Sequence, residues 1–464
     1  MRLAREHTAR CGVLSRTRSL RLRALPASLH RLVPATQPRG NLPCRRTEVK
    51  VLLVTMYFPP AGGGGVQRPL KFATHLPALG IETHVLAPDD PKWLHADPGL
   101  APPTQAWIHR ARYLGPRARR LADELHGRRG LDRLSRQARS LSRRVLVPDE
   151  NVAWNLTAIP AAMRIVRSEG IDVVLTTSPP NSVHLIGAAV KRTTGVRWVA
   201  DLRDSIASHP HRRVERAAVR AKEKVSESVA RLVARQADVI VAASEAIADE
   251  TVALEPVGVV TTVLNGADFD DFAGLEYRRG DRFRITHTGS FFGKRDPRPF
   301  LQALADSGLD NVVARFVGDF RLADREWAES LGLGSRLELH PYVSRREALA
   351  LQRDSDALLL LIPDAGGRGR GVLSGKVFEY LAAERPILAA VPPDGAAADL
   401  IRETGTGVVA APDDVADLTR ALTELHDAWV AGTLDGTALS PDDRERLGRG
   451  ARVEELAEVL RGLA

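Results

Sequence analysis

Continuous apolar runs alternate with amphipathic stretches from residue 49 onward. Unbroken apolar runs are typical of parallel strands buried on both faces, whereas apolar residues three or four apart predict helices. Strand-like runs occur at residues 49–56, 83–87, 173–177, 198–201, 239–243, 284–288, 312–317, 337–339, 357–362 and 387–391. Helical stretches occur between them at 66–79, 182–193, 214–236, 299–307, 345–353 and 375–383. Two such series, separated near residues 265–282, predict an α/β protein with two doubly wound Rossmann-like domains facing a central cleft.

The composition agrees with two globular domains. Of 464 residues, 44% are hydrophobic and 27% charged, which excludes disordered, collagen-like and coiled-coil classes. The two cysteines, Cys11 and Cys44, cannot form a disulfide framework or a cysteine metal site, and they indicate a reducing, cytoplasmic compartment. The longest apolar run, residues 357–362, has the size of a strand, so the sequence predicts no membrane span.

The net charge of +9 arises mainly from two basic segments. Residues 1–47 hold eleven arginines and one acid, Glu6. This composition resembles a transit peptide, but we expect a disordered tail or a start codon placed too far upstream. Residues 108–147 hold twelve arginines and leucines near helical spacing. They fit either amphipathic helices on an anionic membrane at its inner face or a solvated helical face beside a cleft.

Ligands of doubly wound sheets bind beyond the carboxyl ends of the strands. In the first domain this edge carries a glycine run at residues 62–65, which fits neither a dinucleotide fingerprint nor a P-loop. The run is either a flexible turn or a place where a ligand approaches a helix start. A second loop there either orients a hydroxylated substrate or forms an ion-pair cluster that caps a helix. The acceptor-side candidates of these two loops are Gly63, Gly64, Gly65, Asp201, Arg203 and Asp204.

The corresponding edge of the second domain combines glycines with cations. One loop contains Gly289, Ser290, Lys294 and Arg295, and another begins a helix with Ser374, Gly375 and Lys376. Amide groups at a helix start and fixed cations are what a diphosphate needs. Glu379, one turn further, could accept hydrogen bonds from ribose hydroxyls. No residues have the spacing of a metal site, and His184 and His287 are interpreted as structural.

Six blocks of sequence, in order, resemble retaining glycosyltransferases of the GT-B fold, in particular glycosyltransferase family 4. They begin VLLVTMYFPPAGGGG, LTTSPPNSVHL, ADVIVAASEAIADE followed by VLNGADFDDF, HTGSFFGKRDP, HPYVSRREALAL and GVLSGKVFEYLAAERPILA, and span about residues 49–460. The resemblance implies an acceptor-binding domain at 48–275, a donor-binding domain at 276–440, and a helix at 441–464 that returns to the first domain. The donor would be a nucleotide-diphosphate sugar, with a hydroxyl acceptor and no further cofactor or metal, in polysaccharide or glycolipid synthesis.

The resemblance also assigns roles. Lys294 would be the main electrostatic catalyst, assisted by Arg295 or Lys376. The backbone at Tyr342 and Val343 would hold the base, and Glu379 would bind the ribose. The glycine run at 62–65 would contact the acceptor or the transferred sugar.

One departure from the family pattern leaves other functions open. The usual signature has two glutamates, and Gly371 stands at the first position, whose carboxylate normally contacts the donor sugar. Either donor-sugar recognition is altered or transfer activity is lost, and we expect the former. The rivals are a sugar-nucleotide epimerase and a non-catalytic GT-B binding or assembly protein. Nucleic-acid binding is not expected, because the arginines are not interleaved with aromatic residues.

Overall fold

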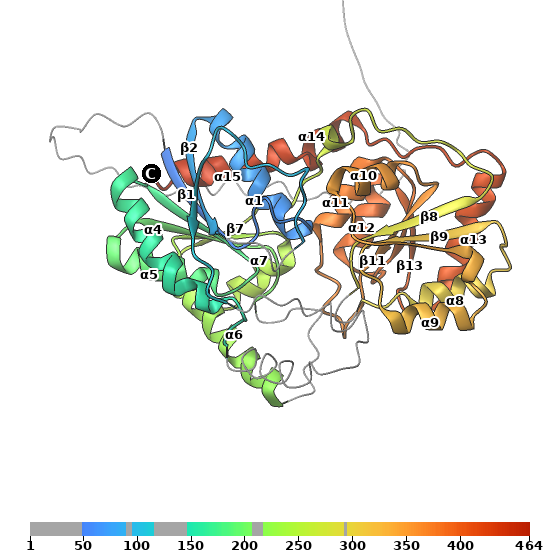
Figure 1. Cartoon of the computed structure of the whole chain (residues 1–464), viewed down its shortest axis with the longest axis horizontal. Helices are drawn as coiled ribbons and strands as arrows, with labels where there is room; N and C mark the ends of the chain where they lie inside the picture. The colour runs from blue at the N-terminus through green and yellow to red at the C-terminus, as the bar shows by residue number, and fades with distance from the viewer. Residues whose placement is uncertain (1–48, 90–94, 116–145, 207–216, 292–294) are drawn as a thin grey trace, which may run out of the picture. The chain divides into compact units, whose positions relative to one another are not determined.

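The computed structural model describes residues 49–464 except 90–94, 116–145, 207–216 and 292–294 (Figure 1). The predicted tail 1–47, most of the basic stretch 108–147, and Lys294 therefore lie outside the described residues. Within the described part, no helix is long and apolar enough to span a bilayer.

The N-terminal domain is built on a seven-stranded parallel sheet in the order β3-β2-β1-β4-β5-β6-β7. Its strands are β1 Val49–Thr55, β2 Ile81–Pro88, β3 Trp107–Ala111, β4 Val173–Ser178, β5 Arg197–Leu202, β6 Val239–Ala242 and β7 Val259–Thr262. Successive residues of β1 enter different cores, Leu52 and Val54 on one face and Val51 and Leu53 on the other. Burial on both faces explains why this strand is apolar at almost every position.

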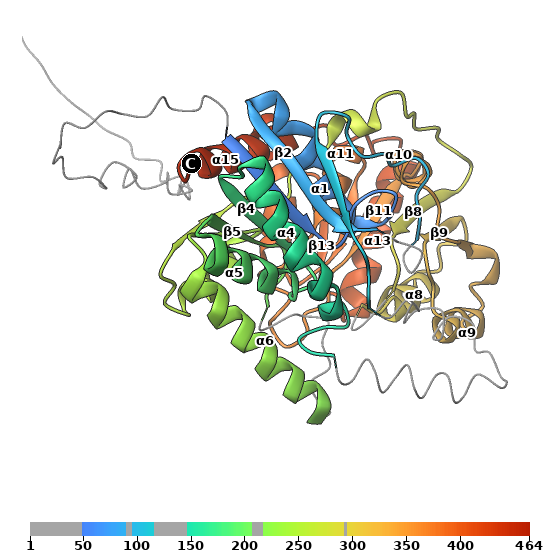
Figure 2. The same ribbon diagram turned by 60° about the vertical axis from the view of Figure 1, so that its left-hand side comes forward.

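Helices cover both faces of this sheet. One face carries α4 Asn155–Glu169, α5 Val183–Thr194 and α6 Ala217–Gln236, which lie side by side in Figure 2. The other face carries α1 Gly64–His75 and α15 Arg449–Arg461. The remaining elements of this half are α7 Glu245–Val252 and the 3-10 turns η2 Pro77–Leu79, η3 Val152–Trp154 and η4 Phe269–Phe272.

The C-terminal domain has a six-stranded parallel sheet in the order β10-β9-β8-β11-β12-β13. Its strands are β8 Phe283–Thr288, β9 Val312–Val317, β10 Leu337–His340, β11 Ala357–Leu361, β12 Ile387–Ala390 and β13 Gly407–Ala410. One face packs on α8 Arg298–Asp306, α9 Leu322–Ser330 and α13 Val415–Val430, and the other on α10 Arg345–Arg353, α11 Gly375–Ala383 and α12 Ala396–Thr404. A 3-10 turn, η5 Gly334–Arg336, precedes β10. The predicted pair of doubly wound α/β domains is confirmed.

The chain returns to the N-terminal domain at its end. The stretch expected to be one helix is two, α14 Pro441–Leu447 and α15, because Gly448 between them is extended. Val453, Leu456 and Leu460 of α15 are buried in the core that α1 and β1 also form. The Arg449 guanidinium donates to both oxygens of Asp268, with Nη2 2.9 Å from Oδ2. The last helix therefore packs on the first sheet.

Candidate functional site

The carboxyl end of β8 leads into two glycines that bring backbone segments close together. Gly289 and Gly318 have φ angles of +121° and +124°, which side-chain-bearing residues rarely adopt. A Cβ built on Gly318 would lie 3.0 Å from the carbonyl carbon of Gly289, and a Cβ on Gly289 would lie 2.9 Å from Nζ of Lys376. The absence of side chains here lets Lys376 of α11 reach the end of β8.

Lys376 lies in the first turn of α11. Its ammonium group donates to the carbonyl oxygen of Thr288, and Nζ is 5.7 Å from the centre of the Tyr380 ring. Burial lowers the pKa of Lys376 to about 8; Glu379 opposes this effect, and Arg295 adds to it. The first turn of α11 has no acidic residue, and Ser374 before it makes no side-chain cap. The helix start is therefore electropositive.

Arg295 provides a second positive charge near Lys376. Its Nη1 donates to the carbonyl of Ser290 at 3.4 Å, and burial lowers the pKa of its guanidinium. The Ser290 hydroxyl in turn donates to Asp319 at 3.1 Å. The structure thus brings together Gly289, Ser290, Arg295, Gly375 and Lys376, as the sequence predicted, and the mutual repulsion of two cations is what an anionic ligand would relieve.

Glu379 lies on the same helix and is held by two side chains. Nη1 of Arg345 donates to its Oε2 at 2.8 Å, and Nε2 of Gln352 donates to its Oε1 at 2.6 Å. Burial raises the pKa of Glu379, but Arg345 and Lys376 outweigh burial, so the pKa lies below its usual value. The carboxylate is ionised and keeps lone pairs on both oxygens for hydroxyl donors. Sequence reasoning missed Arg345, because nothing local indicates that it reaches a residue 34 positions away.

The loop after β10 contacts the N-terminal domain. The Tyr342 ring stacks on His95 with centroids 3.9 Å apart, and a Cβ built on Gly62 would overlap the Tyr342 hydroxyl. His95 Nε2 is 3.5 Å from Asp319 Oδ2. The Tyr342 side chain thus faces the other domain. The predicted base-binding role belongs to the backbone of Tyr342 and Val343, and both residues are half-buried.

The glycine run of the N-terminal domain forms the start of α1. Gly63 precedes the helix with a φ of +94°, and a Cβ on Gly63 or Gly64 would meet nothing within 4 Å. Both glycines are exposed. The Gly65 carbonyl accepts from Nη1 of Arg203 at 2.6 Å, and the same guanidinium donates to the carbonyl of Ser178. Arg203 therefore joins two loops of this edge rather than presenting a free cation.

The structure does not support the predicted acceptor role of Asp201. This residue is fully buried, and its carboxylate accepts from Arg68 Nη2 at 2.7 Å and from the Thr177 hydroxyl at 2.6 Å. This is an ion pair with a distant residue, not the local helix-capping cluster that the sequence left open as the alternative. Asp204 is half-buried. Burial raises the pKa of Tyr57 to about 12. Arg203 opposes this shift, and Asp204 adds to it.

The position of the missing glutamate is packed against the other domain. A Cβ built on Gly371 would overlap the Cβ of Ala246 in α7, so any side chain here would require the loop or the helix to move. The two histidines are buried as expected. His184 Nδ1 is 2.9 Å from the Thr176 hydroxyl, and His287 Nδ1 is 2.8 Å from the carbonyl of Leu359.

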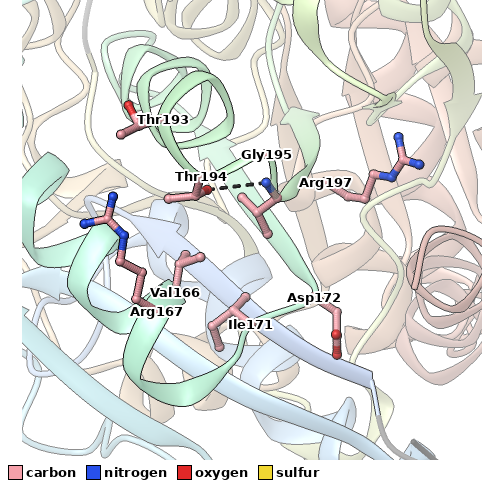
Figure 3. A pocket seen from close by; sticks show the side chains of 9 residues that line it. Val166, Arg167, Ile171, Asp172, Thr193, Thr194, Gly195 and Arg197 are labelled. Atoms are coloured by element: carbon pink, nitrogen blue, oxygen red, sulfur yellow. Dashed lines mark hydrogen bonds between the residues drawn. The ribbon is translucent and has the colours of Figure 1, made fainter. Parts of the chain in front are cut away.

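Two further features do not add to the site. Among the described residues, no group of three or more His, Cys, Asp or Glu could hold a metal ion. An open hollow of about 540 Å³ lies beside Ile171 and Asp172, before β4, and Thr194, before β5 (Figure 3). In Figure 3 the Thr194 hydroxyl accepts from a backbone amide, that of Val196 at 3.3 Å. This hollow is at the amino ends of the strands, the edge opposite to that used by ligands in such sheets.

Comparisons with known proteins agree with this fold. Residues 62–271 match the family model of Glycosyltransferase Family 4. Sucrose-phosphate synthase from Thermosynechococcus elongatus is 14% identical over 89% of this chain and 99% of its own, with a TM-score of 0.59. HepE from Anabaena in complex with UDP-glucose is 14% identical over 89% and 99%, with a TM-score of 0.58. The lipopolysaccharide outer core galactosyltransferase WaaB is 13% identical over 90% and 100%, with a TM-score of 0.53. No curated protein matches the chain.

The comparisons show that the chain has the GT-B fold of these glycosyltransferases. Its N-terminal domain contains the segment that matches Glycosyltransferase Family 4. The resemblance read from the sequence is confirmed.

Proposed function

We propose that this protein is a retaining glycosyltransferase that moves a sugar from a nucleoside diphosphate to a hydroxyl acceptor. The observation that carries the proposal is the pairing of Lys376 and Arg295 at the start of α11, beside two positive-φ glycines. Lys376 donates to the carbonyl of Thr288, and Nη1 of Arg295 donates to the carbonyl of Ser290. The pKa of Glu379, one turn along, lies below its usual value, and this carboxylate is proposed to bind the ribose.

The proposed reaction follows from where charge develops. Breaking the bond between the anomeric carbon and the diphosphate oxygen leaves negative charge on the departing phosphate. Lys376 and Arg295 stabilise that charge, and Lys294 is proposed as the third cation. The acceptor oxygen bonds to the anomeric carbon on the face that the phosphate leaves, and the hydroxyl proton passes to the phosphate oxygen. Configuration is retained, and the step uses no nucleophile or metal ion from the protein.

For the base, the sugar and the acceptor, we propose chemical classes rather than particular molecules. UDP is the first nucleotide to test, because HepE is described in complex with UDP-glucose. The acceptor is proposed to be a polysaccharide or glycolipid, the kind of molecule named for WaaB. The exposed loop of Gly63 and Gly64, which follows β1, is the proposed acceptor side. Asp204, which follows β5, is proposed to belong to the same side.

Peripheral contact with an anionic membrane from the cytoplasm is part of the same proposal. Leu114 and Val147, which belong to the basic stretch 108–147, are 44% and 40% exposed. Apolar side chains beside arginines are the combination that binds anionic lipid surfaces. Sedimentation with phosphatidylglycerol vesicles at low salt tests this part, and no binding would remove it.

The decisive experiment starts with thermal shifts for UDP, GDP and ADP, since a ligand of the folded state raises the melting temperature. The matching sugar nucleotides are then incubated with the protein, first alone and then with hydroxyl acceptors, and the products are examined by NMR. We expect transfer only with acceptor and an unchanged anomeric configuration. Conversion of the sugar without acceptor would show an epimerase. Binding without release of diphosphate for any acceptor would indicate the non-catalytic alternative, which the glycine at position 371 favours.

A further inference from the structure

The first turn of α10 contains Arg345, whose guanidinium joins two acidic residues and whose main chain binds a third. Nη1 of Arg345 donates to Glu379, while Nη2 and Nε donate to Asp271 Oδ2 at 2.8 and 3.3 Å. The backbone N–H of Arg345 donates to Asp97 Oδ2 at 2.7 Å. Asp97 belongs to the N-terminal domain and is 1% exposed. The position of Arg345 is thus fixed by its main chain as well as by its side chain.

The residues around this guanidinium are largely shielded from water. The side chains of Arg345, Asp271 and Glu379 are 15%, 23% and 21% exposed. An arginine fork that binds two carboxylates loses more when truncated than an exposed ion pair does, because the two acids are left without their shared partner. The arrangement therefore has a clear effect on Glu379: it fixes one oxygen and keeps the group ionised.

We propose that Arg345 is a positioning residue for the donor, which holds the Glu379 carboxylate in the orientation that receives the ribose hydroxyls. This inference rests on the proposed function. It adds to the site a residue of α10 that does not itself touch the reacting atoms. Gln352 holds the other oxygen of Glu379 and also donates to the Thr288 hydroxyl at 2.9 Å. The ribose-binding carboxylate is therefore positioned from α10 twice, once by a charge and once by an amide.

The alternative is that Arg345 blocks the carboxylate that the ribose would use. The two roles predict opposite changes in affinity, because removing a blocking group tightens donor binding and removing a positioning group weakens it. The neighbouring residue supplies a matched control. Arg346 is exposed, and its side chain makes no hydrogen bond or ion pair with the described residues.

The first test is calorimetric binding of UDP, GDP and ADP to wild type, Arg345→Met and Arg346→Met at pH 8. We expect Arg345→Met to weaken the binding of the nucleotide that wild type prefers by about tenfold, the loss that goes with one charge-assisted hydrogen bond. Arg346→Met should bind like wild type. Equal or tighter binding by Arg345→Met would overturn the proposal. If wild type and Arg346→Met bind none of the three nucleotides, the proposed function has failed instead.

A second measurement separates positioning from a general loss of structure. Without Arg345, burial raises the pKa of Glu379, and Lys376 on the same helix is the cation that remains beside it. Protonation of Glu379 removes an ionised acceptor, so Arg345→Met should lose further affinity between pH 8 and pH 5.5 relative to Arg346→Met. This extra loss should be absent in Arg345→Met/Glu379→Gln. The same loss at both pH values would show a merely structural role and would also overturn the proposal.

Arg345→Lys guards against a variant that fails to fold. A lysine keeps the charge, but its single ammonium group cannot span Asp271 and Glu379 as the planar fork does. We expect this variant to keep the melting temperature of wild type within a few degrees and to bind the nucleotide with intermediate affinity. Wild-type affinity in Arg345→Lys would be compatible only with a role of charge alone, and it would contradict positioning by the fork.

Discussion

The titration of Lys376 gives a prediction that needs no knowledge of the sugar. Burial lowers its pKa to about 8, so the ammonium group begins to lose its proton in a range that experiments can reach. A bound diphosphate favours the protonated form and raises that pKa. Affinity for the nucleotide is therefore highest well below pH 8, where nearly every Lys376 is protonated, and it falls as the pH rises through the pKa of the free protein.

The size of this effect follows from the fraction of protein that carries the proton. At pH 9, one unit above the free-state pKa of about 8, roughly one molecule in eleven is protonated, so the affinity should be about tenfold weaker than at pH 7. Lys376→Arg should abolish this alkaline decline, because an arginine stays charged at pH 9. Lys376→Met should bind weakly at every pH, without the decline.

The assay is calorimetry with UDP between pH 7 and pH 9.5, with circular dichroism at each pH to verify folding. Ionisation of the diphosphate and of the uracil ring affects wild type and Lys376→Arg alike, so the difference between their pH profiles belongs to Lys376. An affinity that is independent of pH in wild type, or a decline of equal size in Lys376→Arg, would refute the assignment of Lys376 to the phosphate site.

Two further predictions concern stability and packing. Asp201→Asn should lower the free energy of unfolding by about 3–5 kcal/mol in urea titrations, because it leaves Arg68 buried without its carboxylate; a loss below about 1 kcal/mol would mean that Asp201 is exposed to ligand after all. Gly371→Ala should cost about 1–3 kcal/mol by overpacking against Ala246, and Ala246→Gly in the same chain should restore most of it. A double variant as unstable as the single one would show that the two residues are not in contact.

Most strands of the two sheets and the two helices nearest the site could be predicted because their signals are local, whereas β3, β7 and β13 were not predicted. The bounds of α10 and α11 agree with the predicted ranges 345–353 and 375–383. The Ser344 side chain accepts from the Glu347 amide, which is a start signal visible in the sequence. Strand β7 has no such signal: it has four residues and lies at the edge of its sheet, with no fully buried position.

The sequence could predict those site residues whose position follows from the order of strands and helices. Gly289 directly follows β8, Arg295 lies in the loop between β8 and α8, and Lys376 lies at the start of α11, so the topology brings them to one edge of the sheet. Asp201 occupies an equivalent place, yet it is buried because Arg68, 133 residues away, lies beneath it. The local sequence does not indicate an ion pair between residues so far apart in the chain.

The central claim is that the nucleoside diphosphate binds at the start of α11, and a crystal structure of the complex tests it most directly. The protein should be crystallised with whichever of UDP, GDP and ADP raises its melting temperature most. We predict phosphate oxygens within about 3 Å of the Lys376 ammonium group and the amides of the first α11 turn. Phosphates bound anywhere else, including the hollow beside Thr194, with Lys376 still on the Thr288 carbonyl, would contradict the account.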